Sequence, residues 1–413
     1  MKFGRGGFWW ISVAFFLLFV APGLWTPALP NILSTRGLEW VIPYAFAAGP
    51  LASLFSPLIF GSLADYRFSA QKLMGTLSLA GAVFLGLAFA SIEWGWGPWA
   101  YLGFQWLNAL IAAPMMALLS TVALTHLDEP EKRFPLYRLW GTFGWIAAGL
   151  VVSFLAWDSS PMAGMAAMGA RILLGLACFM MPDTPPQGTP GQQLSWRRYF
   201  GMDAIHLFKE PSMRVFLITT VLLSIPLAAF YMYTPILLRD LGDGHPAASM
   251  TLGQVTEVVA LLLLGGFLAR GRVKWVLVAA LAFALLRYLL FAFAGWSGSL
   301  WWVWLGIAMH GPCYTFYYVT GQMLVNRRVE PGMRNQAQAL LGTLSSGMGA
   351  CSGSLLCGWY YGACIGMPGG WSFFWLGLSM VVLACVLFFL SGYRSQRSGS
   401  GSEPGAVHGK SGK

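Results

Sequence analysis

Apolar stretches long enough to cross a membrane recur along the whole chain. A membrane-spanning helix needs about 20 consecutive, predominantly apolar residues. Twelve stretches of this kind are predicted, at residues 8–30, 40–62, 73–92, 98–124, 138–157, 161–181, 213–237, 248–268, 274–294, 299–323, 336–360 and 371–392. The connections between them are mostly short. The sequence therefore predicts an all-α integral membrane protein with twelve transmembrane helices.

The composition agrees with a membrane protein. Hydrophobic types make up 57% of the 413 residues, and charged types make up only 10%. A soluble domain carries about 25% charged residues, and a single soluble core could not hide so much apolar surface. The composition therefore excludes an ordinary soluble enzyme and a disordered chain. Lys2 and Arg5 precede the first span, an arrangement that resembles a signal peptide. The apolar stretch is too long for a signal peptide, so we expect this segment to be retained in the mature protein.

The basic residues predict the orientation. With twelve spans, both termini lie on one side, which is taken as cytoplasmic. All of the 25 Lys and Arg residues then fall on that side or at its edge, except Arg36, Arg171, Arg239 and Arg287. This bias is what the positive-inside rule describes, and it explains the net charge of +10 without a nucleic-acid partner. We expect a multi-pass protein of the plasma membrane, the inner membrane of a bacterium, with both termini cytoplasmic.

The longest connection between spans divides the chain into two parts. We predict an N-terminal six-helix half at residues 1–181, a cytoplasmic linker at 182–212 and a C-terminal six-helix half at 213–392. The tail at 393–413 is rich in glycine and serine, so we expect it to be disordered. Repeated halves are the usual construction of secondary transporters, which bind substrate between the halves.

The sequence contains no recognisable catalytic chemistry. No phosphate-binding loop and no Cys-x-x-Cys occur, and no two histidines stand at metal-ligand spacing. We therefore predict no catalytic residue, no metal and no cofactor, and the chain is not expected to be an enzyme.

Glu257 is the only carboxylate predicted near the middle of a span. A carboxylate at that depth is costly, so it normally faces a cavity or a partner and often carries protons. The alternative is a protonated glutamate that bonds a neighbouring helix. Gln254 lies one turn earlier on the same face and adds amide groups.

A second polar stripe opens the fifth span. Arg138, Thr142 and Trp145 follow one another at positions i, i+4 and i+7, which places a cation, a hydroxyl and a large ring on one helix face. The ring is suited to stacking on a planar or sugar-like ligand, and the other two groups to bonding its polar edge. The alternative is an ordinary cytoplasmic arginine followed by an interfacial tryptophan.

The tenth and eleventh spans carry two further patterns. The spacing i, i+4, i+7 places His310, Tyr314 and Tyr317 on one helix face. This face is a candidate site because histidine can exchange protons near neutral pH. The alternative is an aromatic stripe that only packs. Glycine and serine crowd residues 342–358, and such surfaces let helices approach closely and slide.

Several segments resemble the major facilitator superfamily and, within it, the nucleoside:proton symporter family. The loop after the second span, with Gly61, Asp65 and Arg67, is similar to a degraded form of the superfamily signature. The segments similar to the symporter family are Arg138-Leu-Trp-Gly-Thr-Phe-Gly-Trp145, Gly201-Met-Asp-Ala-Ile-His-Leu-Phe-Lys209, Gln254-Val-Thr-Glu257, Leu286-Arg-Tyr-Leu-Leu-Phe291 and Gln336-Ala-Gln-Ala-Leu-Leu-Gly342.

The resemblance implies a binding site. It gives nucleoside contacts to Arg138, Thr142 and Trp145, and it gives contributions to the site and to proton coupling to Gln254 and Glu257. The chain departs from the family pattern in two places. Tyr314-Thr315 stands where the family can carry an acidic residue after an aromatic one, and Ala228 and Tyr231 stand at the polar positions of the seventh span. Tyr231 or His310 would supply a replacement group.

The predicted function is proton-coupled nucleoside uptake by alternating access, in a monomer whose partners are cargo, protons and lipid. Arg138 and Gln254 bind polar edges, Trp145 and Tyr314 stack, and Glu257 carries or senses the proton. The alternative is proton-coupled or facilitative transport of a sugar or another small polar metabolite. A non-transporting receptor would need a sensing or output domain, and no predicted loop is large enough for one.

Overall fold

Helices make up the part of the chain that the structure describes. The structure is a computed structural model and describes residues 5–127, 129–186, 197, 200–270 and 273–394. The first helices are α1 (Arg5–Trp25), α2 (Leu29–Ser34), α3 (Ile42–Tyr66), α4 (Ala70–Glu93), α5 (Pro98–Ala112), α6 (Met115–His126), α7 (Pro130–Phe154) and α8 (Met162–Phe179). Short 3-10 turns lie at Glu39–Val41, Met202–Lys209 and Pro331–Met333.

The remaining helices follow residue 210. They are α10 (Pro211–Asp240), α11 (Pro246–Arg270), α12 (Val273–Ser297), α13 (Leu300–Ala308), α14 (His310–Tyr314), α15 (Thr320–Asn326), α16 (Arg334–Gly342), α17 (Ala350–Cys364) and α18 (Gly370–Gly392). π-helical turns at Thr315–Val319 and Thr343–Gly349 join α14 to α15 and α16 to α17.

Nine helical stretches within the described residues are long and apolar enough to cross a membrane. Each of the twelve predicted spans coincides with helical residues, but three of them, 40–62, 138–157 and 299–323, are not among the nine. α7 carries Arg133 and Arg138, and the tenth predicted span is divided among three short α-helices and a π-helical turn. The all-helical membrane fold is confirmed, and the count of twelve stays a prediction.

Proline explains one break inside a predicted span. The fourth span is divided at Pro114, between the end of α5 and the start of α6. Proline has no backbone N–H and its ring crowds the preceding turn, so a continuous helix is disfavoured at that point. The first predicted span is likewise divided, between α1 and α2.

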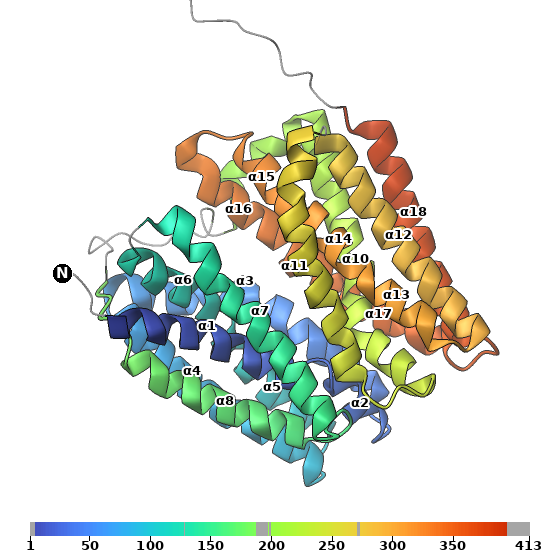
Figure 1. The fold of residues 1–413 in the computed structure, drawn as a ribbon, viewed down its shortest axis with the longest axis horizontal. Helices are drawn as coiled ribbons and strands as arrows, with labels where there is room; N and C mark the ends of the chain where they lie inside the picture. The colour runs from blue at the N-terminus through green and yellow to red at the C-terminus, as the bar shows by residue number, and fades with distance from the viewer. Residues whose placement is uncertain (1–4, 128, 187–196, 198–199, 271–272, 395–413) are drawn as a thin grey trace, which may run out of the picture.

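The helices form two groups that lie side by side (Figure 1). In the first group α1 packs against α7 and α8, and α4 packs against α5 and α8. In the second, α12 packs against α13 and α18, and α10 packs against α17 and α18. The groups meet where α7 contacts α11, where α3 contacts α17 and where α2 contacts α10.

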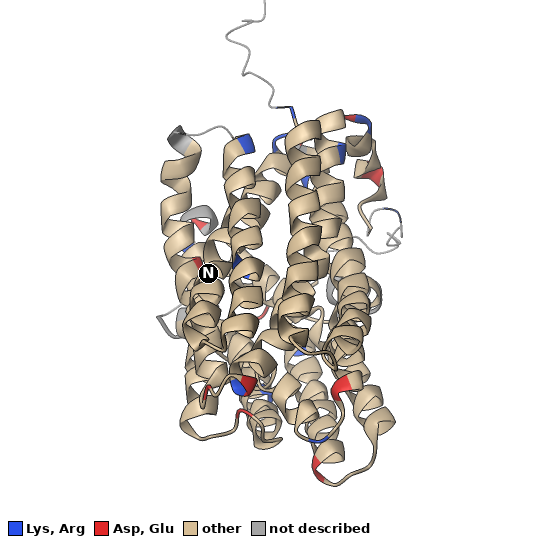
Figure 2. Cartoon of the chain, turned by 90° about the vertical axis from the view of Figure 1, so that its right-hand side faces the viewer, with Lys and Arg blue, Asp and Glu red and all other residues tan. Residues whose placement is uncertain are grey.

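Charged residues lie mainly toward the two ends of the bundle, and most of the backbone between the ends belongs to uncharged residues (Figure 2). The predicted linker begins close to the end of α8, at Phe179, and it ends close to the end of the 3-10 turn Met202–Lys209. Lys2, most of the predicted linker at 187–196 and 198–199, and the tail from 395 lie outside the described residues.

Candidate functional site

Two opposite charges lie on helices that pack together where the two groups of helices meet. Arg138 of α7 and Glu257, near the middle of α11, are both half-buried, and their charges act on each other between these two packed helices. The Arg138 guanidinium carbon also lies 4.2 Å from the centre of the Phe19 ring. This cation–π contact holds the arginine against α1.

The other predicted residues of these two helices lie near this pair in sequence. Thr142 and Trp145 are half-buried on α7, in the turns that follow Arg138. Gln254 is 7% exposed on α11, and its Oε1 accepts no hydrogen bond from any described residue. An unbonded acceptor at this depth is costly, and a bound molecule with an N–H or O–H group would satisfy it.

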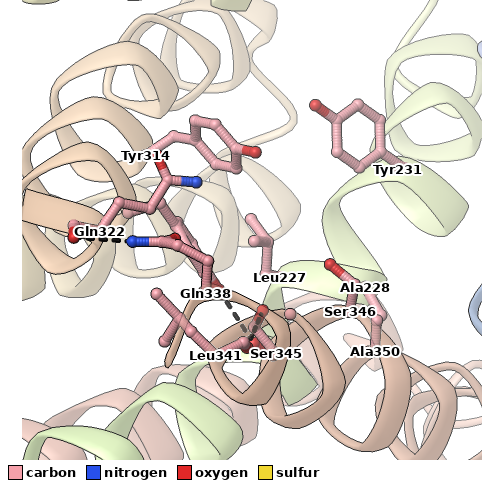
Figure 3. A pocket seen from close by; sticks show the side chains of 13 residues that line it. Leu227, Ala228, Tyr231, Tyr314, Gln322, Gln338, Leu341, Ser345, Ser346 and Ala350 are labelled. Atoms are coloured by element: carbon pink, nitrogen blue, oxygen red, sulfur yellow. Dashed lines mark hydrogen bonds between the residues drawn. The ribbon is translucent and has the colours of Figure 1, made fainter. Parts of the chain in front are cut away.

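A cavity of about 280 Å³ lies within the second group of helices. Of the predicted site residues, Tyr231 and Tyr314 line it, and Figure 3 shows their hydroxyl ends directed toward each other. The Glu257 carboxylate acts electrostatically on both tyrosines, and Arg138 acts on Tyr314. The structure therefore brings Arg138, Glu257, Tyr231 and Tyr314 to one region.

His310 lies behind Tyr231 and is fully buried. Its Nε2 is 3.2 Å from the Tyr231 hydroxyl, and its Nδ1 is 2.9 Å from Nη1 of Arg287 on α12. The imidazole stacks on Phe230 at 4.5 Å between ring centres and on Tyr314 at 5.6 Å. This histidine therefore contacts two residues of the cavity wall, Tyr231 through a hydrogen bond and Tyr314 through ring stacking.

The packing alternative holds for one residue of the tenth-span stripe. The i, i+4, i+7 spacing places Tyr317 on the face of His310 and Tyr314, but Tyr317 is fully buried and pairs with the Thr220 hydroxyl at 3.1 Å. Tyr318 lines the cavity in its place. The π-helical turn Thr315–Val319 explains the difference, because i to i+5 bonding adds a residue to the turn and shifts every later side chain.

Several polar residues of the cavity wall were not predicted as site residues. They come from α10, α15, α16 and both π-helical turns, and they are Ser224, Tyr318, Gln322, Gln338, Ser345 and Ser346. Gln338 donates from Nε2 to the Gln322 carbonyl oxygen at 2.9 Å and to Asn326 Oδ1 at 2.8 Å. Ser345 and Ser346 belong to the glycine- and serine-rich run 342–358, whose composition predicts only a packing surface.

The predicted signature lies away from this cavity. Gly61 and Asp65 belong to the last turns of α3, and the exposed Arg67 follows the helix end. No group of three or more His, Cys, Asp or Glu within the described residues is placed to hold a metal ion.

A second set of contacts joins the two groups of helices at one end. Asp158, in the connection from α7 to α8, accepts hydrogen bonds through Oδ1 from the Ala247 N–H at 2.7 Å and the Ser153 hydroxyl at 3.0 Å. The Ala248 N–H donates to the same serine at 2.9 Å. We call these four residues the Asp158 clamp. Burial raises the pKa of the Asp158 carboxyl, and its hydrogen bonds partly oppose that rise.

Two more hydrogen bonds connect α2 with α10 in this structure. Asn31 donates from Nδ2 to the Pro235 carbonyl oxygen at 3.1 Å, and Arg239 donates from Nη2 to the Ser34 hydroxyl at 3.2 Å. Together with the Asp158 clamp, they hold the two groups together at the end that carries α2 and the start of α11.

Comparison with known proteins identifies the family. The nucleoside H+ symporter family matches residues 9–398 of this chain. The chain belongs to this family.

Two proteins with similar sequences support membership in the symporter family. YegT of Escherichia coli (strain K12) is 31% identical over 400 residues, which cover 92% of each chain. The nucleoside permease NupG of the same organism is 26% identical over 368 residues, 84% of this chain and 86% of NupG. The prediction that the chain is a transporter rather than an enzyme is therefore confirmed.

The fold is also that of a solved nucleoside transporter. A crystal structure of a NupG mutant superposes on this structure with a TM-score of 0.86. The two sequences are 24% identical, and the match covers 94% of this chain and 100% of the NupG chain. As a member of the nucleoside H+ symporter family with several membrane-length apolar helices, the protein is a multi-pass membrane protein.

Proposed function

We propose that the protein carries nucleosides inward together with protons by alternating access. The observation that carries this proposal is the Arg138–Glu257 charge pair, whose members lie on the packed helices α7 and α11 and act electrostatically on each other and on the cavity tyrosine Tyr314. A group that gains or loses a proton changes the attraction across this interface, and a symporter needs such a difference between its two states.

Each site residue has a proposed role. Arg138, Thr142 and Gln254 bond the polar edges of the cargo, and Trp145 and Tyr314 stack on its rings. Glu257 carries or senses the proton, because the tenth-span position next to Tyr314 is Thr315, which cannot ionise. Gly61, Asp65 and Arg67 act in the conformational change and not in binding.

The finer architecture is also a proposal. The chain crosses the membrane twelve times, with halves at 1–181 and 213–392 joined by a cytoplasmic linker at 182–212 and followed by a cytoplasmic tail at 393–413. The distribution of Lys and Arg and the helical state of every predicted span support this topology. The bacterial relatives support the inner membrane as the location. The charge pair and the cavity are formed within one chain, which supports a monomer as the working unit.

Uptake into proteoliposomes tests the function. The purified protein is reconstituted, a panel of labelled nucleosides and sugars is supplied outside, and a proton gradient is imposed or omitted. We expect saturable nucleoside accumulation only with the gradient. Saturable uptake of a sugar in place of every nucleoside would overturn the cargo assignment, and gradient-independent equilibration would overturn the coupling.

A further inference from the structure

A buried arginine without an acidic partner lies behind the cavity. Arg287 is fully buried on α12, and no described residue forms an ion pair with it. Its Nη1 donates to His310 Nδ1 at 2.9 Å, and its Nη2 donates to the Tyr288 hydroxyl at 2.7 Å. The guanidinium carbon lies over the rings of Phe230 and Tyr288, at 4.9 and 4.6 Å from their centres. Buried charges normally require such satisfaction, and here an imidazole nitrogen provides part of it.

The arginine determines which nitrogen of His310 carries the proton. Guanidinium nitrogens donate hydrogen bonds and accept none. Nδ1 of His310 must therefore present its lone pair to Arg287, and the neutral ring carries its single proton on Nε2. A second proton on Nδ1 would point at a guanidinium N–H. Stacking on Phe230 and Tyr314 fixes the ring plane, so the ring is held in one tautomer and one orientation.

The direction of the next hydrogen bond follows. Nε2 of His310 is 3.2 Å from the Tyr231 hydroxyl, so this N–H donates and the hydroxyl oxygen accepts. The hydroxyl proton of Tyr231 is then directed elsewhere, and Tyr231 lines the 280 Å³ cavity. The charged and titratable groups that act on this tyrosine are Glu257, Tyr314 and Arg287.

We infer that the Tyr231 hydroxyl is a one-way hydrogen-bond donor to the cargo, with its direction set by Arg287 through His310. The group that it recognises is an acceptor on the nucleobase, a carbonyl oxygen or an unprotonated ring nitrogen, because the proposed function puts the base beside Tyr314, which lines the same cavity as Tyr231. His310 is then a positioning residue and not a proton carrier. This inference rests on the proposed function, in that the cargo is a nucleoside.

Nucleoside binding to the Tyr231→Phe variant tests the donor. The dissociation constant is measured for one parent nucleoside and for analogues that each lack one base acceptor. We expect Tyr231→Phe to weaken binding of the parent about fivefold, the effect of one lost hydrogen bond. One analogue should bind the unmutated protein about as weakly as the variant binds the parent, and should lose no further affinity in the variant.

Tyr233→Phe is the matched control. Tyr233 is on the same helix and fully buried, and its hydroxyl has no hydrogen-bond partner among the described residues. It does not line the cavity, so this variant should bind the parent as the unmutated protein does. Unchanged binding by Tyr231→Phe, or an equal further loss for every analogue, would overturn the inference.

Nitrogen NMR of ¹⁵N-histidine-labelled protein tests the positioning chain. The His310 signals are assigned as those missing from the His310→Gln variant. We expect one proton, on Nε2, between pH 5 and pH 8, and the appearance of the second tautomer in Arg287→Met. A proton on Nδ1 in the unmutated protein would overturn the assignment, and this measurement decides even if Arg287→Met does not fold.

The binding data distinguish a failure of the proposed nucleoside transport from a failure of the Tyr231 donor role. Absence of saturable nucleoside binding by the unmutated protein would refute the proposed function. Normal nucleoside binding that is insensitive to Tyr231→Phe would refute only the donor role.

Discussion

Glu257 is the residue on which proton coupling depends most directly. Glu257→Gln retains the size and most hydrogen bonds of the side chain but cannot ionise. We expect the variant to lose accumulation of nucleoside against a gradient while it retains binding and exchange, measured as uptake and counterflow in proteoliposomes. Glu330→Gln, which changes an exposed glutamate, is the control. Full proton-driven accumulation by Glu257→Gln would assign coupling to another group.

Arg138 makes a prediction about affinity. Loss of a hydrogen bond from a charged group is worth about 1.5–3 kcal/mol, so Arg138→Ala should weaken nucleoside binding about tenfold or more. Trp145→Ala should also weaken binding, through loss of stacking. Both are measured by equilibrium binding to folded protein. Arg133→Ala removes an exposed arginine of the same helix and should leave the affinity unchanged; an equal loss there would indicate a general charge effect.

Sequence reasoning found some of these residues and missed others for a physical reason. Glu257 was found because a carboxylate within an apolar span is conspicuous by itself. Spacing rules describe neighbours along one helix, whereas Arg287, His310 and Tyr231 come from α12, α14 and α10. Their hydrogen bonds depend on how three helices pack, which no single-helix pattern contains.

The contact between α14 and α11 predicts an effect at the scale of helices. A Cβ atom at Gly311 would meet the backbone of Thr256 and Glu257, so Gly311→Ala would force the helices apart beside the charge pair. Overpacking costs about 1–3 kcal/mol, and we expect a lower unfolding temperature in detergent. Gly266→Ala on α11 has open space around it and is the matched control. Equal stability of the two variants would contradict the tight contact.

The Asp158 clamp predicts a dependence on pH. Burial raises the pKa of this carboxyl in the folded state, so its contribution to stability is fully present below the unfolded pKa and is lost as the pH rises through the folded pKa. His245 acts on it electrostatically. The neutral amide of Asp158→Asn avoids this loss, so the variant should melt higher than the unmutated protein at pH 8, with a difference that shrinks toward pH 4.

A thermal unfolding series across this pH range measures the effect. Asp203→Asn removes an exposed carboxylate and should follow the unmutated protein at every pH. If Asp158→Asn melts lower at pH 8, the charge-assisted hydrogen bonds of the clamp outweigh the cost of its burial.

The topology of the whole molecule is open to direct labelling. In a background without native cysteines, we expect Gln192→Cys in the linker to resist an impermeant thiol reagent in intact cells. Gly244→Cys lies between α10 and α11, is exposed, and should react. Efficient labelling at position 192 from outside would refute the cytoplasmic linker, and failure of both would show only that the assay needs another exposed position.

The apolar composition of a segment predicts that it crosses the membrane, but it does not predict which other helices the segment packs against. The spans of α4 and α11 have mean hydropathies of 2.0 and 1.7, yet 67% of one window and 28% of the other are buried within the protein. Lipid tails are as apolar as a protein core, so both kinds of surface have similar compositions. The contacts of α7 with α11 and of α3 with α17 were therefore visible only in the structure.

The buried Arg287 has a consequence for what the cavity rejects. Among these three described residues, Arg287 and Arg138 exceed Glu257 by one positive charge even while Glu257 is ionised, in a region of low dielectric where fields decay slowly. We expect this surplus to disfavour molecules that bear an ammonium group. We therefore expect uncharged solutes to bind this site better than polyamines or cationic amino acids do.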